Sequence, residues 1–367
     1  MPRKILHLDL DAFFCAAEEQ RDPSLKGKPF AVGGRPEERG VVSSCSYPAR
    51  AFGVRSAMPM RRALQLCPQL QIVPPHYDLY HQLSQQVMER LRAATPLVEQ
   101  VSIDEAFLEV SDLPESGEEW ARRLQAQIRA ELGLPCSLGV AANKLVAKIA
   151  NDYGKRQAPR GAPPNAITIV PPGEEARFLE PLPAEALWGV GPKTAARLAE
   201  LGIRAIGDIA RWPEDDLVEH FGKNGRDMAR RARGIDDSPV TTSHEPKSIS
   251  QEVTFARDVR DLEALKRTLR SLSAGVGRSL RESGYCCGTV KLKFRWPNFQ
   301  TATRQLTLAS PTDSDDHIYQ TALELFGKLW KPGQAVRLLG VGASKLLPAS
   351  LVSAEPRPPG KQLSLWE

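Results

Sequence analysis

The chain has 367 residues, 41% of them hydrophobic and 25% charged, which is the composition of a globular protein and a length that predicts more than one domain. No apolar run approaches the roughly 20 residues of a membrane-spanning helix, and the N-terminus carries acidic residues where a signal peptide has its apolar core. The six cysteines include no Cys-x-x-Cys pair, so the sequence argues against a zinc site and predicts a cytoplasmic protein with buried thiols.

The formal net charge of +5 is unevenly distributed along the chain. Residues 1–243 carry 31 Lys and Arg against 32 Asp and Glu, whereas residues 244–347 carry 16 against 10. A basic segment on an otherwise balanced protein indicates a polyanion partner, although alone it is equally often a solvated surface.

Strands and helices are interleaved through about residue 165, as in a mixed α/β or α+β domain. The alternating stretch 3–14 begins as a strand, and a helical pattern follows it up to the turn at Asp22-Pro23. Further strands are expected at 29–33, 40–44 and 136–142, with a strand pair around Asp104-Glu105. Helices are expected at 58–68, 77–95 and 117–133.

The composition changes at residues 156–173, which are dense in Pro and Gly and predict a linker with a short strand. Short helices are expected over 174–233, followed by a second hinge at 234–245. The last domain is expected to contain an amphipathic helix at 263–284 and strands at 289–296, 304–310 and 336–346. Residues 356–367 are expected to be a Pro-rich tether that ends in a short apolar motif.

Two acidic clusters stand out because each lies in an apolar strand pattern. Asp9 and Asp11 share one face of the first strand, whereas Asp104 and Glu105 are adjacent in VSIDEAFLEV and meet one ligand only if the chain bends between them. A buried unpaired carboxylate is costly, so a solvated hairpin tip, a buried ion pair and a metal site are the alternatives. Together the clusters would make a hard-oxygen site suited to Mg²⁺ and to phosphoryl transfer.

Four collinear motifs identify a family. LHLDLDAFFCAAEE, GVVSSCSYPARAFGVRSAMP, VSIDEAFLEV and SLGVAANKLVAKIANDYGK resemble, in this order, the polymerase core of the Y-family translesion DNA polymerases, closest to the bacterial DNA polymerase IV type. The resemblance covers the first 155 residues, continues more loosely to about 347 and includes the tail.

The resemblance implies an α+β multidomain fold, a right-hand polymerase with a palm of mixed sheet and helices, small fingers, a helix-hairpin-helix thumb and an α/β little finger. The boundaries it implies are palm 1–12 and 75–165, fingers 13–74, thumb 166–233, linker 234–243, little finger 244–347 and, at 348–367, a flexible tail.

For catalysis, the resemblance implies that Asp9 and Asp104 bridge two Mg²⁺ ions, with Mn²⁺ as a substitute. Glu105 would lie beside the primer 3′ end, and the backbone carbonyl of Leu10 would be a further ligand. Asp11 matches a family position that is acidic but is not usually counted as a principal ligand, so it ranks lower.

For nucleotide binding, the resemblance implies that Phe14 is a steric gate against a 2′-hydroxyl and that Phe13 packs beneath the nucleotide. By spacing alone Phe14 would be an ordinary core aromatic residue. The residues expected to bind the triphosphate are Ser44, Tyr47, Arg50 and Lys155, whose chemistry suits phosphate oxygens.

The NKxxAK signature holds Asn143, Lys144 and Lys148, and the two lysines are four apart on one helical face, which is also typical of a solvated basic stripe. After Lys155 the family continues as KPxG, but this chain reads Lys155-Arg156-Gln157-Ala158-Pro159-Arg160-Gly161, as though residues were inserted. Arg156 is therefore an alternative to Lys155.

DNA contacts are expected in two regions. Gly189, Gly191 and Lys193 match a helix-hairpin-helix turn whose amides approach a phosphate, although a lone GxG mostly marks a tight turn. The basic last domain offers a group of phosphate contacts, Lys247, Lys291, Lys293, Arg295 and Arg304, of which the three in KLKFR alternate onto one strand face.

The C-terminal QLSLW resembles the QLxLF-type peptide that docks on the bacterial sliding clamp, with Trp in place of the usual Phe. The residues concerned are Gln362, Leu363, Leu365 and Trp366, and the alternative is a plain disordered tail.

The sequence thus predicts a template-directed DNA polymerase of low fidelity for translesion synthesis, acting as a monomer on primer-template DNA and dNTPs, with the clamp as partner and no membrane. A palm-type cyclase or two-metal nuclease would share the carboxylates but would not need the hairpin, the basic domain and the tail together. The other alternative is a non-catalytic polymerase-like adaptor that binds DNA and the sliding clamp.

Overall fold

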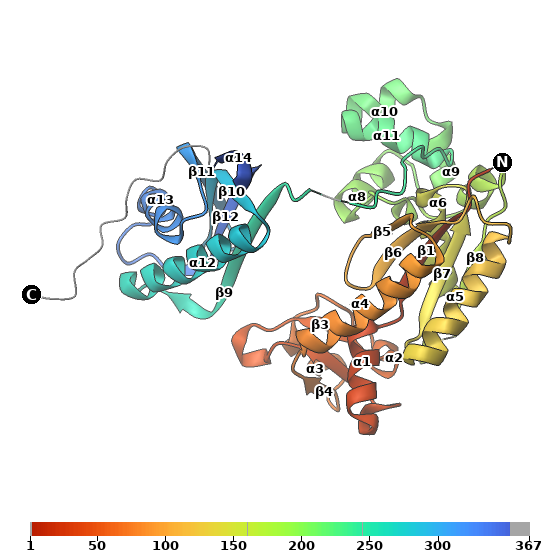
Figure 1. The fold of residues 1–367 in the computed structure, drawn as a ribbon, viewed down its shortest axis with the longest axis horizontal. Helices are drawn as coiled ribbons and strands as arrows, with labels where there is room; N and C mark the ends of the chain where they lie inside the picture. The colour runs from red at the N-terminus through yellow and green to blue at the C-terminus, as the bar shows by residue number, and fades with distance from the viewer. Residues whose placement is uncertain (1, 160, 244, 353–367) are drawn as a thin grey trace, which may run out of the picture. The chain divides into compact units, whose positions relative to one another are not determined.

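The computed structural model describes residues 2–159, 161–243 and 245–352 (Figure 1). The chain divides into two compact units, one of residues 1–36 with 40–243 and one of residues 37–39 with 244–367. In the part of the chain that the model describes, no helix is long and apolar enough to span a membrane.

A five-stranded sheet is the centre of the first unit, with strand order β5-β6-β1-β7-β8. Its central strand β1 is antiparallel to both neighbours, β6 and β7, while β8 runs parallel to β7. The bounds are β1 Ile5–Leu10, β5 Val98–Gln100, β6 Glu105–Glu109, β7 Cys136–Ala141 and β8 Ile167–Ile169.

The two faces of this sheet belong to different cores because side chains alternate along each strand. Leu6 and Leu8 of β1 pack into a core shared with three helices, α1 (Phe13–Arg21), α4 (Tyr77–Ala94) and α5 (Gly117–Leu132). Ile5 belongs to the core of the opposite face, which is covered by α6 (Lys144–Gln157). His7 and Asp9 alternate onto this second face, so Asp9, and Glu105 opposite it in β6, lie on the side of α6.

Local sequence signals explain where the covering helices begin and end. Ser116 and Glu119 form a reciprocal capping box at the start of α5, and Gly133 ends that helix with φ 63°. Asn143 caps α6 by accepting a hydrogen bond from the Val146 N–H.

A small three-stranded sheet, of order β3-β2-β4, follows α1 in the chain. β2 pairs antiparallel with β3 and parallel with β4, around a compact core that includes Ala31 and Met60. The bounds are η1 Pro23–Leu25, β2 Phe30–Gly33, η2 Pro36–Glu38, β3 Val42–Cys45, α2 Tyr47–Ala51, α3 Met60–Leu66 and β4 Gln71–Val73.

Short helices form the rest of the first unit, as the sequence predicts. They share the second core with Ile5 and Phe107 of the main sheet, so they are packed on the sheet through α6. The bounds are α7 Glu175–Leu179, η3 Ala184–Ala186, α8 Pro192–Glu200, α9 Ile206–Arg211, α10 Glu214–Phe221 and α11 Lys223–Ala232.

The segment after α11 was predicted to be a linker, but its first residues are hydrogen-bonded to the first unit. The Asn143 side chain donates to the Gly234 carbonyl, the Leu145 N–H donates to Asp236, and Val240 is buried in the second core. The first half of this segment is therefore part of the folded unit.

The second unit is a four-stranded antiparallel sheet of order β11-β10-β12-β9 with helices α12 and α13. Both helices contribute to its hydrophobic core, which includes Leu269 and Phe326. The sequence pattern predicted α12 and the strands β10, β11 and β12, whereas α13 was not predicted. The bounds are β9 Ser248–Val259, α12 Leu262–Glu282, β10 Tyr285–Arg295, β11 Thr301–Thr312, α13 Asp315–Gly327, β12 Val336–Pro348 and α14 Ala349–Val352.

The packing of α6 on β7 depends on Gly139, because a Cβ there would lie 1.9 Å from the Ala147 carbonyl oxygen. Gly139→Ala is therefore expected to lower the free energy of unfolding by about 2 kcal/mol, measured by urea denaturation. Gly327→Ala is the control, since a Cβ at Gly327 meets nothing within 4 Å, and it is expected to leave stability unchanged or slightly higher. An unchanged midpoint for Gly139→Ala would contradict this packing.

Candidate active site

The pairing of β1 with β6 brings two of the predicted acids together. Asp9 lies directly opposite Glu105 in the antiparallel register. Asp104 lies outside the strand, since β6 begins only at Glu105, and the Leu10 N–H donates to the Asp104 carbonyl at 3.0 Å. β5 and β6 form the antiparallel strand pair expected around the two acids, and only the interpretation of VSIDEAFLEV as one apolar strand is wrong. The chain bends before β6, so the side chains of Asp104 and Glu105 are not held on opposite faces of one strand.

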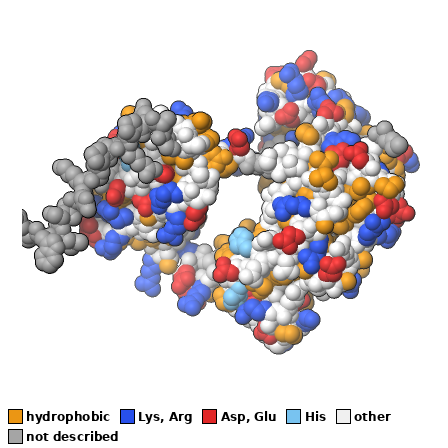
Figure 2. All heavy atoms as spheres, in the orientation of Figure 1, with side chains coloured by type: hydrophobic (Ala, Val, Ile, Leu, Met, Phe, Trp, Pro, Cys, Tyr) orange, Lys and Arg blue, Asp and Glu red, His pale blue; other side chains and the backbone are white. Residues whose placement is uncertain are grey.

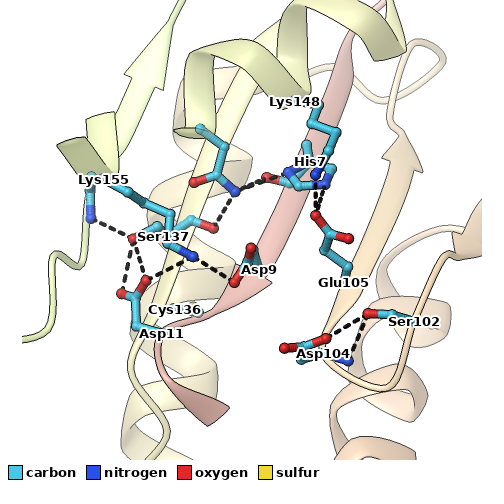
Figure 3. Close-up of polar contacts among 12 residues, drawn as sticks. His7, Asp9, Asp11, Ser102, Asp104, Glu105, Cys136, Ser137, Lys148 and Lys155 are labelled. Carbon is cyan, nitrogen blue, oxygen red and sulfur yellow. Dashed lines mark hydrogen bonds and ion pairs between the residues drawn. The ribbon is translucent and has the colours of Figure 1, made fainter. Parts of the chain in front are cut away.

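Each acid has a separate polar partner (Figure 3). Lys155 Nζ donates to Asp9 Oδ1 at 2.6 Å, and Ser102 Oγ donates to Asp104 Oδ1 at 2.6 Å. Glu105 accepts a hydrogen bond from Lys148 Nζ. Among the described residues, no three His, Cys, Asp or Glu side chains converge closely enough to form a ready-made metal cluster.

The two adjacent acids have opposite electrostatic environments. Burial raises the pKa of the Asp104 carboxyl, and the neighbouring charges of Asp9 and Glu105 raise it further. Burial alone would also raise the pKa of Glu105, but the side chains of His7 and Lys148 outweigh it and lower that pKa to about 2. Of these two acids, Asp104 therefore carries the less compensated charge, which a bound cation would stabilise.

His7 is a site residue that the sequence pattern does not single out. Its side chain is fully buried, with Nε2 3.2 Å from Glu105 Oε1 but imperfectly aligned for a hydrogen bond. The Asn151 amide donates to the carbonyls of His7 and Ser137, which directs its N–H₂ group toward His7 Nδ1 at 3.0 Å. Nδ1 is therefore the acceptor, and the Nε2 hydrogen faces Glu105. The available signal was a polar residue two positions before Asp9 on the same strand face.

Asp11 is structural in its contacts. It is 1% exposed and accepts hydrogen bonds from Ser137 Oγ at 2.9 and 3.0 Å and from the Asn165 N–H at 3.0 Å. Lys155 Nζ lies 3.3 Å away. Asp11 thus ties β7 and the segment that departs from the family pattern back to the end of β1, which agrees with its lower rank as a ligand.

The predicted lysines are all paired. Lys144 is almost buried and donates to Glu99 at 2.8 Å, and Lys148 binds Glu105, so they do not form a solvated basic stripe. Burial disfavours the charged form of Lys155, but Asp9 and Asp11 outweigh this and raise its pKa.

A polar cavity of about 270 Å³ brings most of the predicted catalytic and nucleotide-binding residues together. Phe13 and Phe14 reach it because Ala12, just before α1, adopts φ 49°, a left-handed conformation that is strained for alanine. Its lining residues are Asp9, Leu10, Ala12, Phe13, Phe14, Ser43, Ser44, Arg50, Ser56, Asp104 and Lys155.

Tyr47 lies beside this cavity and lines a neighbouring one of about 150 Å³. The Arg50 guanidinium is 4.8 Å from the centre of the Tyr47 ring. The Tyr47 hydroxyl is buried and makes no hydrogen bond to any described residue, which is an unusual cost for a structural tyrosine. A ligand oxygen would satisfy it.

The predicted DNA-binding residues form separate groups. Gly189 adopts φ 100°, and Gly191 is the N-cap of α8, followed after one residue by Lys193. In the second unit Lys291, Lys293 and Arg295 alternate with the buried residues of β10, and Lys293 donates to Glu252 at 2.7 Å. Figure 2 shows Lys and Arg side chains dispersed over both units and interspersed with Asp and Glu.

Arg304 does not share a strand face with Lys291, Lys293 and Arg295. It is in register with Leu292, which faces the core, whereas Lys291 pairs with Gln305 and Lys293 with Thr303. Residues directly opposite each other in a sheet share a face, so Arg304 points to the helix side. Lys247 precedes β9 and is exposed. The predicted clamp-binding residues, Gln362, Leu363, Leu365 and Trp366, lie outside the described residues.

Comparison with family models gives three matches in chain order. Residues 8–152 match the impB/mucB/samB family, residues 172–203 match the IMS family HHH motif, and residues 246–365 match the impB/mucB/samB family C-terminal domain.

Similar full-length proteins carry one name. The chain is 42% identical to the DNA polymerase IV of Desulfatibacillum aliphaticivorans, covering 94% of this chain and 85% of the relative. It is 42% identical to the DNA polymerase IV of Methanoculleus marisnigri, covering 94% of each chain. The solved structure of a Y-family DNA polymerase chimera of Dbh and Dpo4 matches with a TM-score of 0.83 at 26% identity, over 94% of this chain and 99% of the other. The predicted α+β multidomain polymerase fold is confirmed.

The contrast between Asp11 and Asp104 can be tested by stability. Asp11→Ala would leave buried donors of Ser137 and Asn165 without an acceptor, so we expect a loss on the order of 3 kcal/mol in the free energy of unfolding. Asp104→Ala removes a charge that burial and like charges already disfavour, so stability should change by less than about 1 kcal/mol or rise. The free energy of unfolding of both variants is measured by urea denaturation. A larger loss in Asp104→Ala than in Asp11→Ala would refute the structural role of Asp11.

Proposed function

The chain belongs to the impB/mucB/samB family of Y-family DNA polymerases and is a DNA-directed DNA polymerase, and from this premise we propose that it adds dNTPs to a primer 3′ end with two Mg²⁺ ions held by Asp9, Asp104 and Glu105. We propose Mn²⁺ as a substitute metal. Y-family polymerases use divalent metal ions, and the oxygen ligands here have the hard character that Mg²⁺ prefers.

The observation that carries this proposal is the single cavity shared by acids and nucleotide-binding residues. Asp9, Asp104 and Leu10 line it together with Phe14 and Lys155. A metal site alone would not need the aromatic and cationic residues, and a phosphate site alone would not need the destabilised carboxylate of Asp104.

Bound Mg²⁺ would supply activation of the primer 3′-hydroxyl and neutralisation of charge on the phosphates. The remaining contributions come from the protein. Arg50 and Lys155 would hold the triphosphate as cations, and the Ser44 and Tyr47 hydroxyls would donate to its oxygens. Lys148 and His7 would keep Glu105 ionised beside the primer end.

The triphosphate would compete with Asp9 for Lys155. In the structure Lys155 Nζ donates to Asp9 Oδ1 at 2.6 Å, and both residues line the cavity. When Lys155 turns to phosphate oxygens, Asp9 is released to bind a cation, so nucleotide entry and metal binding at Asp9 would support each other. Arg156 follows Lys155 on α6 but does not line the cavity, which favours Lys155 as the phosphate-binding residue.

Family membership supports a proposal for the wider biological role. We propose synthesis past damaged template bases with low fidelity, in the cytoplasm, by a monomer that binds the sliding clamp through Gln362, Leu363, Leu365 and Trp366. Gly189, Gly191 and Lys193, with the basic face of β10, are proposed to contact the primer-template duplex through its phosphates. Neither the non-catalytic adaptor nor the cyclase and nuclease alternatives is favoured, because the relatives are named as polymerases over nearly the full chain.

Primer extension tests the catalytic assignment. Asp104→Ala is expected to lower kcat/KM for dNTP incorporation by about 10³-fold or more, because several kcal/mol of charge stabilisation is lost. The exposed Asp112, a few residues beyond β6, provides the matched control Asp112→Ala, which should extend the primer at the wild-type rate.

Template dependence is tested with the same samples. Extension should follow the template and stop when the metal is chelated. Undiminished extension by Asp104→Ala would refute the metal assignment, and turnover without a template would refute the polymerase mechanism.

A further inference from the structure

A fully buried carboxylate lies one helical turn beyond the proposed steric gate. Glu18 is 0% exposed and is four residues after Phe14 on α1, so both residues lie on one face of that helix. Tyr80 Oη donates to Glu18 Oε1 at 2.5 Å, His76 Nδ1 lies 2.7 Å from the same oxygen, and Arg21 Nε donates to Oε2 at 2.9 Å. Nothing in the proposed polymerase mechanism uses this carboxylate.

Glu18 is ionised in this network. Burial alone would raise its pKa, but the donors Tyr80, Arg21 and His76 outweigh burial and hold the pKa below its ordinary value. Burial and the bond to Glu18 both raise the pKa of Tyr80, so the proton stays on the phenol. The result is a charge-assisted hydrogen bond from α4 to α1, which is among the stronger polar contacts in proteins.

The Tyr80 ring lies directly against Phe14. Their centroids are 4.3 Å apart and their planes differ by only 12°. Tyr77 packs edge-on against both rings, at 6.2 Å from Phe14 and 5.9 Å from Tyr80. Phe14 lines the cavity and is partly exposed there, whereas Tyr80 is fully buried behind it.

A steric-gate side chain excludes a 2′-hydroxyl only if that side chain cannot move aside. A phenylalanine side chain turns about two torsions, and a shift of about 1 Å is enough to admit an extra oxygen atom. The stacked Tyr80 ring blocks this movement of Phe14. The hydrogen bond from the Tyr80 hydroxyl to Glu18 keeps the Tyr80 ring in place.

We propose that Glu18 is a positioning residue for sugar selection, which acts by fixing Tyr80 as the support behind Phe14. This inference rests on the proposed function, in which the chain is a DNA polymerase and Phe14 faces the incoming sugar. Glu18 and Tyr80 act through Phe14 and do not touch the nucleotide.

The decisive variant is Tyr80→Phe, which removes one hydroxyl and keeps the stacked ring. Tyr77→Phe is the matched control, because it deletes the same group from the neighbouring ring, which is 52% exposed and retains its contacts with Phe14. Glu18→Gln keeps the shape of the side chain and removes its charge. Phe14→Ala tests the gate itself.

The measurement is the selectivity for dNTP over rNTP, the ratio of the two kcat/KM values in single-nucleotide primer extension. Tyr80→Phe and Glu18→Gln are expected to lower this ratio about tenfold, mainly through a higher kcat/KM for rNTP, because a charge-assisted hydrogen bond is lost. Tyr77→Phe should stay within about twofold of wild type, a change of no more than about 0.4 kcal/mol. Combining Tyr80→Phe with Phe14→Ala should add nothing to the loss caused by Phe14→Ala alone.

The outcomes separate this inference from the function on which it rests. If Phe14→Ala retains wild-type selectivity, the gate assignment is wrong, and the inference falls with it. If Phe14→Ala loses selectivity but Tyr80→Phe and Glu18→Gln do not, the gate stands and Glu18 has no positioning role. If Tyr80→Phe lowers kcat/KM equally for dNTP and rNTP, the network only stabilises the fold, and the proposal is overturned. Should Glu18→Gln fail to fold, Tyr80→Phe decides alone.

Discussion

The site depends on one constraint, which is that the register of β1 against β6 brings like charges together. Asp9 faces Glu105 across the pair, and the bend before β6 adds Asp104. Three carboxylates this close repel one another, so the fold must supply positive charge. It does so from one helix, α6, whose Lys148 and Lys155 bind Glu105 and Asp9.

Helix α6 therefore connects the acidic cluster to the rest of the fold. Lys148, Asn151 and Lys155 are spaced three and four residues apart, so they lie on the side that faces the sheet. Gly139 of β7 lets this helix approach closely enough for the lysines to reach the acids. The start of α6 also holds the segment after α11 through Asn143, which places the short helices and the acid cluster on the same support. A change that moved α6 would disturb the acids, their partners and the packing of these helices together.

The sequence was sufficient where residue type and spacing carry the information. Residue type and spacing predicted the acidic clusters, the strand alternation and the glycine turn at Gly189. Four ordered motifs indicated the family. The remaining features depend on tertiary contacts. A bend between Asp104 and Glu105 was inferred from their adjacency, but the start of β6 at Glu105 depends on its pairing with β1 and β5. His7 and Glu18 read as ordinary polar residues until burial and partners are known, and the face of Arg304 depends on the pairing of β11 with β10.

In the proposed mechanism, Asp9, Asp104 and Glu105 hold two metal ions. Electron paramagnetic resonance of Mn²⁺ bound to the protein with primer-template DNA and a non-hydrolysable dNTP tests this most directly. In the wild-type protein we expect two bound ions about 3.5 to 4 Å apart, close enough for spin coupling. In Asp104→Ala we expect that coupling to be lost. A single uncoupled ion in the wild type, or an unchanged coupled pair in Asp104→Ala, would contradict it.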